Sequence, residues 1–144
     1  MKQKGFTLIE LLAVIVILAI IALIATPMIL GVIDTAKRSS AKSSIQYYVE
    51  AVEKTLVTSQ LGSTIYNVSS GDVYTVDGKT LTKKTGAENS SDTITIDYKG
   101  DTPSGTITFG NSGLVSKAEL TFPGIIDKLV TYDLAASNLV TIAD

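Results

Sequence analysis

The sequence contains no cysteine and no histidine. Without cysteine, no disulfide and no thiolate metal site can form, so the folded part depends on packing for its stability. Without histidine, the chain lacks the commonest general base near neutral pH and the commonest nitrogen ligand for metals. We therefore expect no enzyme activity, with no catalytic residue, no cofactor and no metal.

Positive charge is scarce in the C-terminal part of the chain. From Gly62 to Asp144 there are ten carboxylates and six lysines, a net charge of about −4, which argues against nucleic-acid binding. Acidic pairs such as Asp72 and Asp77 lack the spacing of an EF-hand calcium loop. Two matches to the N-glycosylation pattern, at Asn67 and Asn89, are expected by chance in a chain rich in serine and threonine.

One long apolar run dominates the N-terminal part. No charged residue occurs from Leu11 to Ile33, and roughly 20 apolar residues suffice for a helix to cross a bilayer core of ~30 Å. The apolar region of a cleaved secretory signal is shorter, about 7 to 15 residues, and ends at a small-residue cleavage site. We predict a retained membrane segment. Basic residues flank both of its ends, so charge alone does not set its orientation.

Glu10 lies at the leading edge of this run. Together with Thr7 it fits the capping-box pattern, in which a hydroxyl and a carboxylate satisfy the free amides at a helix start. A carboxylate in a membrane segment usually has a partner, since it costs around 2.5 to 3.5 kcal/mol near the bilayer centre. If the chain were cut after Gly5, the new amino group of Phe6 would lie one helical turn away, in the same chain or in a neighbour. The sequence allows both roles.

The string from Lys4 to Glu10, KGFTLIE, follows a short basic leader and precedes the apolar run. It resembles the class III signal of type IV prepilins and related pseudopilins, over Met1 to about Gly31. The resemblance implies that a membrane peptidase cuts after Gly5 and N-methylates Phe6, and that Glu10 then sets register during assembly. Pro27 removes a helical hydrogen bond and Gly31 adds freedom, so both predict a kink.

The resemblance also implies partners and a location. The expected partners are further copies of the chain in a helical filament, a prepilin peptidase and methylase, an inner-membrane assembly platform, and membrane lipid before assembly. The expected precursor is a single-pass cell membrane protein with a cytoplasmic N-terminus and an external head, and the product is a surface pilus. Two alternatives stay open: a pseudopilin of a type II secretion or DNA-uptake machine, and a single-pass anchored binding domain.

Helical periodicity continues beyond Asp34, with Tyr47 on the flank of the buried stripe and Gly62 at the helix end. The apolar side chains at spacings of three and four form one stripe, which we expect to pack on the head: Ala41, Ile45, Tyr48, Val49, Val52 and Leu56.

Period-two alternation then predicts strands. A short hairpin is expected around Asp77-Gly78, an exposed loop at 83–92, and then a three-strand meander. Its first strand contains the alternating residues Ile94, Ile96 and Tyr98, and its second contains Ile107 and Phe109. In that meander, Leu114, Ala118, Leu120 and Phe122 share the buried face of the third strand, and residues 129–134 add an optional fourth, edge strand.

A sheet with one apolar face and a helix with one apolar stripe together predict an α+β fold, in which a long N-terminal helix packs on an antiparallel sheet of three to four strands. The predicted divisions are a leader at 1–5, a transmembrane or filament-core helix at 6–33, an amphipathic helix at 34–61 and a globular head at 62–144. Within the head, 63–92 is the connecting region and 93–134 the sheet.

Overall fold

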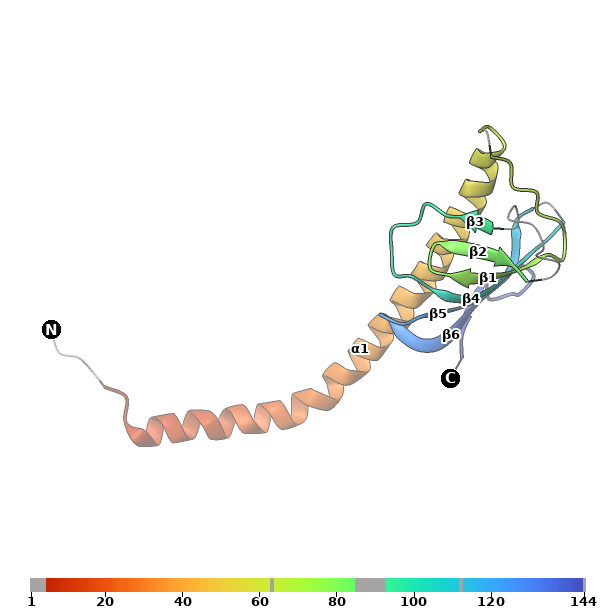
Figure 1. Ribbon diagram of the computed structural model, residues 1–144. Helices are drawn as coiled ribbons and strands as arrows, with labels where there is room; N and C mark the ends of the chain where they lie inside the picture. Colours follow the sequence, from red (N-terminus) through yellow and green to blue (C-terminus); the bar gives the residue numbers. More distant parts are fainter. Residues whose placement is uncertain (1–4, 63, 85–92, 112, 144) are drawn as a thin grey trace. The chain divides into compact units, whose positions relative to one another are not determined.

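A computed structural model describes residues 5–62, 64–84, 93–111 and 113–143. Most of the predicted leader, most of the loop predicted at 83–92, and Asn89 lie outside these residues. In these residues one helix is followed by seven strands: α1 (Leu8–Ser59), β1 (Val73–Asp77), β2 (Thr80–Lys83), β3 (Thr93–Thr95), β4 (Ser104–Phe109), β5 (Val115–Phe122), β6 (Ile126–Asp133) and β7 (Val140–Ile142). Figure 1 labels α1 and the strands from β1 to β6.

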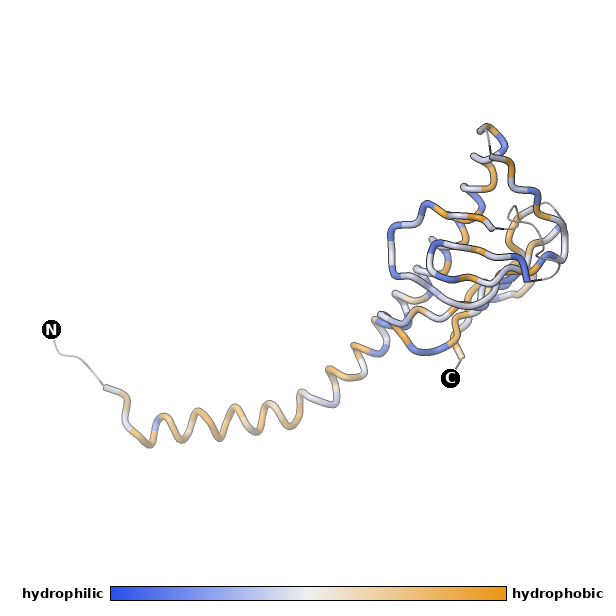
Figure 2. Tube along the Cα trace, in the orientation of Figure 1, coloured by the Kyte–Doolittle hydropathy of each residue, from blue (hydrophilic) through white to orange (hydrophobic). Residues whose placement is uncertain are grey.

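The chain divides into two compact units, Met1–Ala36 and Lys37–Asp144, which we call the N-terminal unit and the head. The described part of the N-terminal unit consists of α1 and the three residues before it. Its large apolar side chains are exposed, and Figure 2 shows the continuous apolar character of this stretch. Among the described residues, α1 is the one helix long and apolar enough to cross a membrane, judged by length and composition.

The head is built on the apolar stripe of α1. The side chains that α1 buries are Ala41, Ile45, Tyr48, Val49, Val52 and Leu56. Tyr48 is fully buried, its ring meets that of Tyr98 edge to face with centroids 5.0 Å apart, and its hydroxyl donates to the carbonyl oxygen of Gly78 at 2.8 Å. Burial raises the pKa of Tyr48, so the phenol stays protonated as a donor. The neighbouring Tyr47 is exposed.

The sheet is antiparallel throughout, with the strand order β3-β2-β1-β4-β5-β6-β7. Together with α1 it gives the predicted α+β class. The hairpin predicted around Asp77-Gly78 is confirmed as β1 and β2, which pair from Tyr74 opposite Lys83 to Asp77 opposite Thr80. Gly78 has a φ of 60°, a value that tight hairpin turns require and that glycine adopts without strain.

The predicted number of strands is wrong, because the described sheet has seven strands and not three to four. The segment at Ile94 was expected to pair with the strand at Ile107. Instead, β3 pairs with β2, while the hairpin of β1 and β2 lies between β3 and β4. Alternation of side chains marks a strand but does not select its partner, because the same two-residue period fits any neighbour.

Two further expectations about the later strands are wrong. Leu114 was placed on the buried face, but it is 42% exposed and Val115 is fully buried. A register shift between Thr108 and Phe109 sets Phe109 opposite Val115, and a shift by one residue exchanges the two faces of a strand. The expected edge strand at 129–134 belongs to β6, which is not an edge because β7 pairs with it.

We expect Gly105→Ala to destabilise the head by at least about 2 kcal/mol. Gly105 lies in β4 with a φ of 150°, and an added Cβ would overlap the backbone carbonyl oxygen of Glu119 on β5. Thermal unfolding of the full chain in detergent, followed by near-ultraviolet circular dichroism of the buried tyrosines, measures the effect. Gly62→Ala is the control, since its nearest atoms would be at 3.8 Å. Equal midpoints for the two variants would contradict the constraint on Gly105.

We expect Glu53→Leu to cost about 1–3 kcal/mol, because it leaves a buried donor without its acceptor. Glu53 on α1 accepts a hydrogen bond from the backbone N–H of Val115 at 3.0 Å, and Val115 is fully buried. Glu53→Gln retains an acceptor oxygen and should unfold close to wild type in the same assay. Equal destabilisation by the two substitutions would show that charge, and not this hydrogen bond, is what matters at Glu53.

Candidate processing and assembly site

The start of α1 is fixed by a reciprocal capping box. Residues 5–7 are not helical, and α1 begins at Leu8. The Glu10 carboxylate oxygen Oε2 accepts from the backbone N–H of Thr7 at 2.9 Å and from its hydroxyl at 2.8 Å. In return, the Thr7 hydroxyl oxygen accepts from the backbone N–H of Glu10 at 3.3 Å. Two amides that a helix start leaves without intrahelical partners are thereby satisfied.

The peptide bond between Gly5 and Phe6 lies just outside this cap. The Phe6 side chain is 90% exposed, and no atom lies within 4 Å of the position that a Cβ on Gly5 would take. A protease needs the backbone around the bond it cuts to be extended and accessible. Because the cap places the first helical residue at Leu8, the Gly5–Phe6 bond stays out of the helix.

Gly5 and Phe6 lie directly before α1 and Glu10 lies in its first turn, whereas Pro27 and Gly31 lie further along α1. The Thr26 hydroxyl donates to the carbonyl oxygen of Ala22 at 2.7 Å. Such a bond to the carbonyl four residues earlier tends to bend a helix. The kink at Pro27 and Gly31 stays a prediction, since α1 is helical on both sides of the proline.

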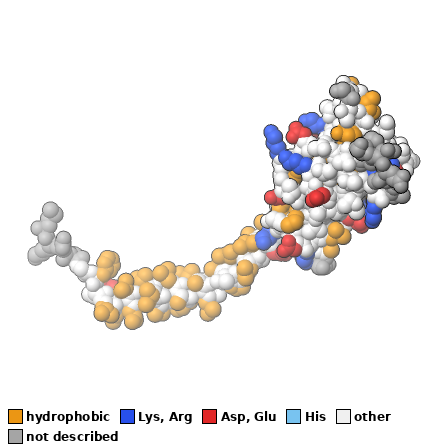
Figure 3. All heavy atoms as spheres, viewed as in Figure 1, with side chains coloured by type: hydrophobic (Ala, Val, Ile, Leu, Met, Phe, Trp, Pro, Cys, Tyr) orange, Lys and Arg blue, Asp and Glu red, His pale blue; other side chains and the backbone are white. Residues whose placement is uncertain are grey.

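The apolar side chains that follow Glu10 are not covered by any described residue of their own unit. Figure 3 shows them gathered along the helix, whereas the visible face of the head carries interspersed acidic and basic side chains. Every large apolar residue from Phe6 to Ile33 is at least 45% exposed. A soluble monomer rarely exposes a contiguous apolar surface of this extent, so lipid or another protein must cover it.

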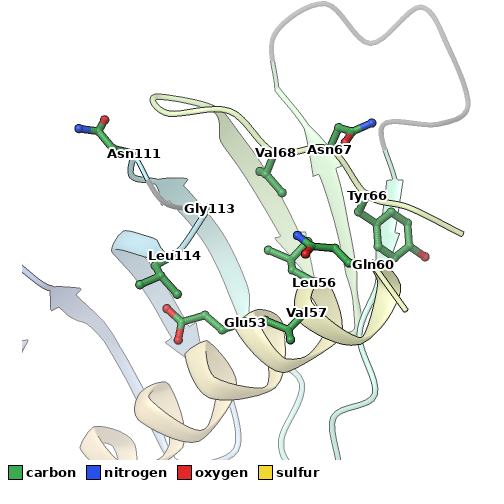
Figure 4. Close-up of a pocket in the computed structure, with 10 residues that line it drawn as sticks. All are labelled: Glu53, Leu56, Val57, Gln60, Tyr66, Asn67, Val68, Asn111, Gly113 and Leu114. Atoms are coloured by element: carbon green, nitrogen blue, oxygen red, sulfur yellow. The ribbon is translucent and has the colours of Figure 1, made fainter. Parts of the chain in front are cut away.

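The head also has a half-open groove of about 320 Å³ beside the last turns of α1 (Figure 4). Leu56, Val68 and Leu114 line it together with the carboxylate of Glu53 and the amide of Gln60. Glu53 is already bonded to the N–H of Val115. One carboxylate tied to the backbone, with no adjacent nucleophile or base, does not form a catalytic arrangement.

The acidic residues considered for calcium do not form a ligand set. Among the described residues, no group of three or more histidine, cysteine, aspartate or glutamate side chains is placed to hold a metal ion. Asp72 instead receives the ammonium of Lys83 at 2.8 Å. This hydrogen bond lowers the pKa of Asp72, so the carboxylate is charged and already paired.

Sequence reasoning identified Thr7 as part of a capping pattern but gave it no further role, and it did not identify Glu53. The contact between Glu53 and Val115 joins residues 62 positions apart, so no local pattern could have marked it. The capping pattern predicted for Thr7 and Glu10 is confirmed, and it was visible in the sequence because the two residues are only three positions apart.

Residues 1–26 match the prokaryotic N-terminal methylation motif. No curated protein and no solved structure matches the chain.

The matched segment contains the Gly5–Phe6 bond, the capping box and most of the exposed apolar surface described above. A class III signal implies processing by a prepilin peptidase, and pilin-like proteins are generally structural subunits without enzyme activity. An apolar helix behind such a signal is consistent with residence in a membrane and then in a pilus. The chain is thus a type IV pilin- or pseudopilin-like protein, with the N-methylation motif of that superfamily on a long N-terminal helix followed by an antiparallel sheet.

Proposed function

We propose that this chain is the structural subunit of a type IV pilus-like filament. The precursor resides in the cell membrane through α1, with its N-terminus in the cytoplasm and its head outside. A prepilin peptidase cuts after Gly5 and the new terminus, Phe6, is N-methylated. The subunit then leaves the bilayer at an inner-membrane assembly platform and joins a helical filament of identical chains.

The exposed apolar surface of α1 carries this proposal. In a bilayer, lipid chains cover the surface, and in a filament the same surface of neighbouring helices replaces the lipid. Exchange of one apolar environment for another costs little, because burial free energy depends mainly on the apolar area removed from water. The same helix therefore serves as a membrane anchor first and as filament core afterwards.

Glu10 gives the assembly its register. A charge in an apolar filament core is tolerated only when it has a partner of opposite sign. Processing creates such a partner, the Phe6 amine, close in sequence to the capping box. A helix that stops with Glu10 beside a neighbour's amine lies at one defined axial position, and a helix displaced along the axis leaves a charge unpaired.

Two other roles remain for comparison. A pseudopilin of a type II secretion or DNA-uptake machine shares the same processing and helix, but it forms a short assembly within the envelope. Electron microscopy of intact cells separates these cases, since only the pilus extends from the surface. A single-pass anchored binding domain, in contrast, requires neither cleavage after Gly5 nor Glu10.

We expect Gly5→Leu to leave the leader attached. The space beside Gly5 is open, so a peptidase can approach the scissile bond there, and a leucine side chain would fill that space. Mass spectrometry of the protein purified from its native cell should show a chain that begins at Met1 for the variant and at Phe6 for the unsubstituted protein. An unsubstituted protein that also begins at Met1 would remove the prepilin function.

We expect Glu10→Ala to reduce filament yield at least roughly tenfold while membrane insertion stays intact, since an unpaired charge in an apolar core costs about 3–5 kcal/mol. Immunoblots of sheared filaments and of the membrane fraction measure both quantities. Glu50→Ala is the control, because Glu50 is an exposed carboxylate on the same helix. Filaments at the level of the control would refute the register role of Glu10.

A further inference from the structure

The Glu10 carboxylate uses its two oxygens unequally. Oε2 accepts both hydrogen bonds from Thr7, from the backbone N–H and from the hydroxyl. Among the residues that the structure describes, no donor approaches Oε1 within hydrogen-bond distance. A carboxylate has room for about four hydrogen bonds over its two oxygens, so one half of the group is occupied and the other half can take a further donor.

We infer that Thr7 is a positioning residue for filament assembly, which holds Glu10 by Oε2 so that Oε1 is available to the amine of a processed Phe6. Thr7 acts through Glu10, so its role rests on the proposed function. Without the Thr7 hydroxyl, Oε2 of Glu10 keeps one of its two hydrogen bonds, that from the backbone N–H of Thr7, so the side chain is held less firmly in this rotamer. Fixing one rotamer beforehand lowers the entropic cost of forming the ion pair, which is the general advantage of a preorganised site.

The same contact also serves the precursor in the membrane. Before cleavage no Phe6 amine exists, and the carboxylate lies at the edge of an apolar segment where unsatisfied acceptors are costly. The hydroxyl and the amide of Thr7 supply two donors at 2.8 and 2.9 Å within the same chain. Assembly then adds a partner to Glu10 and does not require the existing ones to break.

A helix cap alone would explain the Thr7 contact, so the experiment must separate capping from positioning. Thr7→Val removes the hydroxyl, keeps the side-chain shape and leaves the charge of Glu10. Glu10→Gln removes the charge but still supports a capping box, since glutamine serves at this position as glutamate does. Thr7→Ser retains a hydroxyl at the same atom. Thr58→Val removes another threonine hydroxyl of α1, one that bonds to the carbonyl of Lys54.

Filament yield, membrane level and the N-terminal mass are measured for these variants and for Thr7→Val combined with Glu10→Gln. Loss of a helix-cap hydroxyl changes equilibria by roughly 2- to 30-fold, and we expect Thr7→Val to lower filament yield within that range. Membrane level and cleavage should stay unchanged, and Thr7→Ser and Thr58→Val should assemble like the unsubstituted chain. In the Glu10→Gln background, Thr7→Val should have no further effect, because the charge that Thr7 positions is gone.

Three outcomes would overturn the role of Thr7 and leave the proposed function intact. The first is a normal filament yield for Thr7→Val. The second is an equal penalty for Thr7→Val in the unsubstituted chain and in the Glu10→Gln background, which indicates a cap only. The third is an uncut leader in Thr7→Val, which indicates a role in processing. If Glu10→Gln alone abolishes filaments, the double variant gives no information, and the filament yields of Thr7→Val and Thr7→Ser are compared instead. A lower yield for Thr7→Val than for Thr7→Ser supports the role of the hydroxyl, and equal yields contradict it. Normal filaments from Glu10→Gln would instead remove the register function of Glu10 itself.

Discussion

The apolar surface of α1 between Phe6 and Ile33 is the constraint on which the other features of this protein depend. No described part of its own unit covers these side chains. The hydrophobic effect therefore disfavours this surface in water and favours lipid or an apolar protein surface around it.

The same helix changes character where the head begins. From Ala41 to Leu56 its apolar residues narrow to one stripe, and the sheet covers that stripe. The contacts that join helix and sheet include two polar ones, from Tyr48 to Gly78 and from Val115 to Glu53. Such contacts add direction to an otherwise non-directional apolar interface, because a misplaced helix would leave a buried donor unsatisfied.

At the other end, Thr7 and Glu10 place a single polar cluster at the boundary between leader and helix. One set of hydrogen bonds begins the helix and leaves the Gly5–Phe6 bond outside it. In the function proposed above, the residues of processing and of assembly are therefore close neighbours in the chain, and the variants of Thr7 distinguish an effect on one step from an effect on the other.

The sequence by itself determined the features that depend on residues near one another in the chain. The class III signal, the apolar run and the stripe on α1 follow from a short string, a length and a helical period, and the hairpin at Asp77-Gly78 follows from a two-residue turn. Only the tertiary structure decided which strands pair. β3 joins β2 instead of β4, a shift near Phe109 buries Val115 in place of Leu114, and Glu53 binds an amide 62 residues away. The physical reason is that a strand's alternation is compatible with any partner, and the choice among partners depends on packing over the whole sheet.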